Sequence, residues 1–101
     1  MKTITEIPAA WKDTSDLFLA LGDEHRQRIL LAFEAGERLN ISQIVSASTL
    51  SRTAVTHHLN VLKQAKLLNY EKVGKEMQFW INQSMISEAL NRVQIYIQTQ
   101  T

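Results

Sequence analysis

Two adjacent histidines, His57 and His58, are the side chains of this chain that first suggest metal binding or general-base chemistry. They lie in the segment SRTAVTHHLNVL, among small hydroxyl residues and without an acidic neighbour. Adjacent residues of a helix point about 100° apart, whereas two histidines that share an ion stand three or four residues apart. The pair is therefore not expected to bind a metal.

The other residue types exclude further kinds of chemistry. The chain has no cysteine, so a disulfide, a thiolate metal site and a thiol redox switch are all excluded. Asp13, Asp16, Asp23 and Glu24 lie at expected helix starts, where capping explains them without catalysis. We therefore expect neither an enzyme nor a bound cofactor.

The bulk properties are typical of one globular domain, residues 1–101. Hydrophobic residues make up 45% of the chain and charged residues 21%. No apolar run reaches the ~18 residues of a membrane span, and the segment MKTITEIPAAWKD lacks the apolar stretch of a secretory leader. We expect a cytoplasmic protein.

Positive charge gathers in one part of a chain whose net charge is only +1. Residues 51–75 carry five basic side chains against one acidic, whereas residues 1–50 carry five basic and seven acidic. A positive segment suits a partner that carries phosphates, although a solvated lysine face would give the same count.

Three helices are expected before residue 50. The first covers 13–21, with Asp13 or Thr14 as its cap, and the second begins after the cap Asp23. A short third helix runs from about 42 to 47.

A fourth helix, expected after the cap Ser51, has one apolar and one polar face. Val55, Leu59 and Leu62 fall within an arc of about 60° and form the buried side. The outer face carries Thr53, His57, Asn60 and Gln64, with Arg52, Thr56 and Lys63 on one flank.

The period changes after residue 69, where YEKVGKEMQFWI alternates around the turn residues VGKE. This pattern predicts a two-stranded hairpin over about 68–81, with Lys72 and Lys75 near its tip. These lysines are expected to contact nucleic acid, and a solvated tip is the alternative.

The complete order of elements indicates a fold. A helix-turn-helix at about 41–66, a hairpin wing and a last helix over 83–98 make a winged helix-turn-helix. The expected class is mainly α, with five helices plus a two-stranded wing.

Three segments resemble the ArsR/SmtB family of bacterial winged-helix repressors: ALGDEHRQRIL, SRTAVTHHLNVLKQAKLL and GKEMQFWIN. The resemblance covers about residues 15–82. It implies a homodimer that binds an operator and releases it when a signal arrives.

The chain departs from that family at two places. Where the family usually has a glycine before the recognition helix, this chain has Thr49, and a left-handed conformation there would cost about 1 kcal/mol. The cysteines of metal-sensing relatives align with Asn40 and Ser42, and only Glu88 matches the ligands on the last helix. Because of these departures, neither metal site of the family is expected to form in this chain.

The fourth helix is interpreted as the recognition helix, whose first turn enters the major groove. Arg52 can read guanine or bind phosphate, and the sequence does not choose between them. His57 is expected to contact DNA rather than stay idle, while His58 is expected to be partly buried and hydrogen-bonded inside the domain. The expected DNA-binding residues are Ser51, Arg52, Thr53, Thr56, His57, Asn60, Lys63, Lys72 and Lys75.

An apolar stripe on the last helix has no further domain to cover, so we expect it to form a two-fold dimer interface together with the first helix. The alternative is that the stripe closes only its own core. The expected interface residues are Trp11, Leu17, Ile86, Leu90, Val93 and Ile97.

Two residues have open interpretations. Trp80 either packs under the last helix or marks a partner or ligand site. Arg26 is either structural or part of an ion pair beside a phosphate.

The sequence therefore predicts a dimeric transcription regulator, most simply a repressor, that binds double-stranded DNA. The alternative is a winged-helix module that binds another protein, which would carry fewer cations along residues 51–75. The operator, the target genes and any small-molecule or protein effector are not specified by the sequence.

Overall fold

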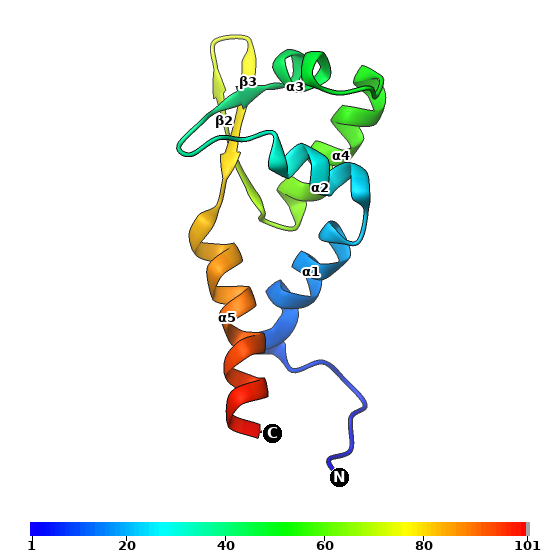
Figure 1. Ribbon diagram of the computed structural model, residues 1–101, viewed down its shortest axis with the longest axis vertical. Helices are drawn as coiled ribbons and strands as arrows, with labels where there is room; N and C mark the ends of the chain where they lie inside the picture. The colour runs from blue at the N-terminus through cyan, green and yellow to red at the C-terminus, as the bar shows by residue number, and fades with distance from the viewer. Residues whose placement is uncertain (101) are drawn as a thin grey trace.

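The computed structural model describes residues 1–100 as an elongated body, 51 Å long and 24 by 20 Å across (Figure 1). In chain order the elements are η1 (Ala9–Trp11), α1 (Lys12–Leu21), α2 (Glu24–Leu31), β1 (Leu39–Asn40), α3 (Ile41–Ala47), α4 (Arg52–Gln64), β2 (Leu68–Val73), β3 (Glu76–Ile81) and α5 (Gln83–Gln100). Helices α1 and α5 pack side by side and form the stalk. The head, at the other end, contains α2, α3, α4 and the three strands.

One hydrophobic core fills the head and continues into the stalk. Each amphipathic helix supplies one face: Leu17 of α1, Ile44 of α3 and Leu59 of α4 are at most 2% exposed. Phe79 closes the core from the side of the sheet. Among the described residues of α5, only Ala89 is fully buried, so the stalk is covered on one side alone.

Side-chain caps begin the helices of the head close to the predicted positions. The carboxylate of Asp23 accepts the N–H of His25 at 2.8 Å at the start of α2. The hydroxyl of Ser51 accepts the N–H of Ala54 at 3.1 Å at the start of α4. Both caps were predicted, while α3 begins one residue earlier than expected, at Ile41.

The predicted start of the first helix is wrong. The 3-10 turn η1 leads directly into α1, so the helix begins at Lys12, and Trp11 occupies the cap position without a side-chain hydrogen bond. Asp13 and Thr14 lie inside the helix as a result. Thr14 is 1% exposed, and its hydroxyl donates to the carbonyl of Ala89 in α5.

The predicted hairpin is present, but the sheet has three strands rather than two. Strands β2 and β3 pair antiparallel from Leu68 opposite Ile81 to Val73 opposite Glu76, and we call this hairpin the wing. The two residues of β1 pair with β3 on its other edge, with Leu39 opposite Phe79. A two-residue strand is too short to show an alternating pattern, which explains why the sequence did not predict β1.

The turn between α3 and α4 does not use a left-handed residue. Thr49 has an ordinary φ, so the strain expected there is absent. The turn instead relies on Ser48, whose backbone is extended and whose hydroxyl accepts the N–H of Leu50 at 2.9 Å. Within residues 1–100, the one non-glycine residue with positive φ is Lys66, at φ 67°.

Lys66 ends α4 in the position that glycine usually takes. Its N–H donates to the carbonyl of Lys63, and the next N–H, of Leu67, donates to the carbonyl of Leu62. Asn82, just before α5, then donates its side-chain N–H to the carbonyl of Lys66 at 3.1 Å. This joint holds the end of α4 against the beginning of the stalk helix α5.

Candidate nucleic-acid interface

The outer face of α4 is open to solvent, as the sequence predicts. Val55, Leu59 and Leu62 are at most 1% exposed on the inner face of the helix. Thr53, His57 and Asn60 lie opposite them and are exposed. These outer side chains offer hydroxyl, imidazole and amide groups, which can donate to and accept from the edges of bases.

Arg52 ties the first turn of α4 to α3. Its Nη1 donates to the hydroxyl of Ser42 at 3.1 Å. Lys75, from the tip of the wing, lines a shallow cavity of about 210 Å³ together with these two residues. Ser42 is a residue of this surface that sequence reasoning missed, because its contact with Arg52 depends on how α3 and α4 cross.

The other members of the predicted set differ in exposure. Lys72 and Lys75 are exposed on the wing, and the turn between them uses Gly74 at φ +63°. Lys63 is partly buried because its Nζ lies 4.6 Å from the centre of the Tyr70 ring on β2. Ser51 is exposed and Thr56 is half-buried. Contact of any of these residues with DNA stays a prediction.

His58 is a partly buried, hydrogen-bonded residue, as the sequence predicts. Its Nδ1 lies 3.3 Å from Nη1 of Arg26, which can only donate, so Nδ1 accepts. Burial lowers the pKa of His58, and the guanidinium of Arg26 lowers it further, while the carboxylate of Asp23 raises it. The ring is therefore held neutral, with its proton on Nε2.

Arg26 has a structural role that joins three helices. Its Nε donates to the carbonyl of Ala20 at 2.6 Å, and its Nη2 lies 3.5 Å from the carbonyl of Leu19. The guanidinium thereby satisfies carbonyls at the end of α1 while it holds His58 on α4. Of the two interpretations, the structural one describes these contacts.

All residues of the predicted dimer interface except one are at least partly exposed. Leu17 is 0% exposed within a single chain, so it cannot meet a partner, and its assignment to the interface is wrong. Periodicity placed it on an apolar stripe, but that stripe faces the core. Leu90 is 47% exposed and Ile97 56% exposed, while Trp11 lies edge-on to the ring of Tyr96. Ile86 and Val93 are half-buried.

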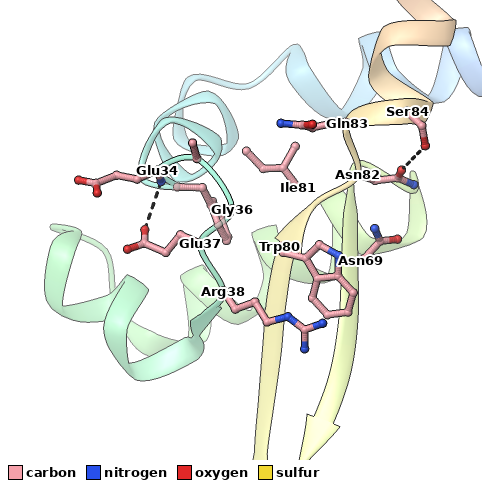
Figure 2. Close-up of a pocket in the computed structure, with 12 residues that line it drawn as sticks. Glu34, Gly36, Glu37, Arg38, Asn69, Trp80, Ile81, Asn82, Gln83 and Ser84 are labelled. Atoms are coloured by element: carbon pink, nitrogen blue, oxygen red, sulfur yellow. Dashed lines mark hydrogen bonds between the residues drawn. The ribbon is translucent and has the colours of Figure 1, made fainter.

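Trp80 lines a cavity of about 680 Å³ (Figure 2). Its indole stacks with the guanidinium of Arg38 at 3.9 Å from the ring centre, and Arg38 pairs with Glu71 at 2.6 Å. Sequence reasoning found Trp80 but missed Arg38. Figure 2 shows the side chains of Glu34 and Glu37 pointing away from Trp80, so the polar groups do not converge on one point.

The described part of the chain, residues 1–100, holds no cluster of three or more His, Cys, Asp or Glu side chains that could bind a metal ion. The rings of His57 and His58 are 5.3 Å apart and inclined by 57°. Over the same residues, no helix is both long and apolar enough to cross a membrane.

Comparison with known proteins supports the resemblance. Residues 23–70 match the family described as "Bacterial regulatory protein, arsR family". Transcriptional repressor SdpR of Bacillus subtilis is 26% identical over 77 residues, which cover 76% of this chain and 84% of that protein. A transcriptional repressor SmtB homolog of Synechocystis is 26% identical over 84 residues, or 83% of this chain and 63% of that protein. Both relatives are named as transcriptional repressors.

Solved structures confirm the predicted fold class. An ArsR-like transcriptional regulator from Rhodococcus superposes with a TM-score of 0.78 at 24% identity, covering 86% of this chain and 81% of the other. A homodimeric winged helix-turn-helix DNA-binding domain from Mycobacterium bovis gives a TM-score of 0.69 at 18% identity, covering 100% and 94%. The head described above is therefore a winged helix-turn-helix.

Proposed function

We propose that this chain is a transcription regulator of the ArsR family, and that two copies bind an inverted-repeat operator and repress transcription. Two of its relatives are named as repressors, which favours repression over activation. Two-fold symmetry in the protein calls for two-fold symmetry in the site, because each copy reads one half.

The outer face of α4 is the observation that carries this proposal. A helix fits the major groove of DNA, which is about 12 Å wide. Thr53 and His57 project from the first two turns of α4, the part that reaches base edges in helix-turn-helix docking. Asn60 follows on the same exposed face and can pair with adenine.

Positively charged side chains beside this face of α4 would contact the phosphate backbone of the DNA. Arg52 is fixed by Ser42 next to the wing, where Lys72 and Lys75 are exposed. Contacts of this kind position the protein on the duplex without reading its sequence, and each releases counterions. The remaining proposed contacts come from Ser51, Thr56 and Lys63.

A second copy is proposed to cover the exposed side of the stalk. Leu90 presents its apolar side chain to solvent near the middle of α5, where burial would favour association. The domain from Mycobacterium bovis with the same fold is described as homodimeric. The proposed interface consists of Trp11, Ile86, Leu90, Val93 and Ile97.

Selection of genomic fragments on the purified protein, followed by gel shift at low salt, tests the proposal. We expect retained fragments to share an inverted repeat upstream of a gene, and transcription of that gene to rise when the protein is removed. Retention of no fragment at low salt would refute DNA binding, and falling transcription would refute repression. Function on chromosomal DNA places the protein in the cytoplasm.

A further inference from the structure

The two flanks of α4 face different parts of the head. Arg52 and Lys63 lie on one flank, beside the wing. His58 lies on the other flank, beside α2, with its ring centre 5.6 Å from that of His25. The rings of His57, His58 and His25 therefore form a row that runs from the outer face of α4 to the first turn of α2.

This row ends at a small cleft of about 150 Å³ between α2 and the turn that precedes α4. His25 and Arg28 line it from α2, and Ser48 and Thr49 line it from the turn. Arg28 is exposed and its Nη2 donates to Nδ1 of His25. Because Nδ1 accepts this bond, the neutral ring carries its proton on Nε2, where it is a second donor beside the guanidinium.

The charged groups next to the cleft are engaged elsewhere, so Arg28 and His25 are the groups that can offer donors to an anion there. Asp23 turns its carboxylate toward the backbone N–H groups of His25 and Arg26. Arg26 is engaged by carbonyls of α1 and by His58. The guanidinium of Arg28 is held by His25 at the edge of the turn, where an anion could approach both groups.

We propose that Arg28 and His25 bind a backbone phosphate of the operator, on the side of α4 away from the wing. The inference rests on the proposed function, because it assumes that α4 lies in the major groove. That groove is bounded by two phosphate backbones, so a helix lying in it has one on either flank. The wing lysines face one backbone, and Arg28 with His25 face the other.

The salt dependence of binding tests the proposal, with fluorescent random-sequence duplex DNA as the probe. Affinity falls as salt rises, and the loss of one phosphate contact makes the plot of log affinity against log salt less steep by about 0.9. For Arg28→Gln, the affinity advantage of the wild type should therefore shrink about 3-fold between roughly 50 and 200 mM salt. Arg28→Lys should restore most of the slope, since it keeps the charge.

The control variant is Lys2→Gln, which removes the same charge at the far end of the stalk, where Lys2 donates to the side chain of Gln100 at the end of α5. We expect it to keep the wild-type slope. Both arginine variants should unfold at the wild-type temperature, because Arg28 is exposed. A wild-type slope for Arg28→Gln overturns the phosphate site but leaves the proposed function standing, whereas no DNA binding by the wild type overturns both.

Discussion

Helices α4 and α5 both carry an apolar stripe, but only one of the two stripes is covered within the chain. On α4, the stripe is sealed inside the head, and the opposite face presents polar groups to solvent. On α5, Ala89 is 1% exposed while Leu90, the next residue, is 47% exposed. The difference agrees with the two partners proposed above: a polar one for α4 and an apolar one for α5.

The largest expected effect concerns α5. Leu90→Glu should break the proposed dimer, because an unpaired buried carboxylate costs about 3–5 kcal/mol. Sedimentation equilibrium measures the change in mass. Asn91→Glu is the matched control, since the adjacent residue points about 100° away, and it should stay dimeric. A dimeric Leu90→Glu variant would show that the stripe on α5 is not the interface.

The next effect concerns the outer face of α4. His57→Ala should lower the ratio of operator to random-sequence affinity by about 1–3 kcal/mol, because a contact with a base edge is lost. Competition gel shifts measure this ratio. Lys75→Ala should instead weaken binding to both duplexes alike, since it acts on the backbone. If His57→Ala keeps the full preference, the outer face does not read sequence.

A smaller effect is expected at the joint between head and stalk. Lys66→Gly should raise the free energy of unfolding by up to about 1 kcal/mol, because glycine adopts positive φ without strain. Lys66→Ala keeps the strain and is the control for loss of the exposed ion pair with Asp13. Chemical denaturation compares the two variants. Equal stability would mean that Lys66 is not strained.

The smallest effect concerns the flank of α4 that faces α2, where burial lowers the pKa of His58 below its ordinary value of 6.5. The unfolded chain then binds the proton more readily, so stability is retained above pH 6.5 and falls as pH drops below it. Urea unfolding at several pH values measures this. His58→Gln should flatten the decline, whereas His57→Gln should not. An unchanged decline in His58→Gln would contradict the assignment.

Local signals in the sequence predicted the head well. The caps Asp23 and Ser51 bond to N–H groups within three residues, so their effect needs no knowledge of the rest of the fold. Gly74 marks the wing for the same reason, because a positive φ is a property of one residue. The polar face of α4 also followed from periodicity alone.

The sequence could not predict the contacts between segments that are distant along the chain. Periodicity showed that Leu17 belongs to an apolar stripe, but not whether that stripe meets its own core or a partner. Arg38 meets Trp80 because β1, which follows it directly, pairs with β3, and the cleft at Arg28 exists because α2 packs beside the turn before α4. Neither arrangement leaves a local pattern.

The contacts of Arg26 bear on the length of DNA that a dimer can span. Its guanidinium fastens the end of α1 to His58, so the recognition helix has little freedom to pivot on its own stalk. In the proposed dimer, the distance between the two recognition helices is then set by how the stalks cross at the two-fold axis. Apolar side chains that never contact DNA would therefore determine how many base pairs separate the two half-sites. A substitution among these side chains would change the operator spacing that the dimer binds.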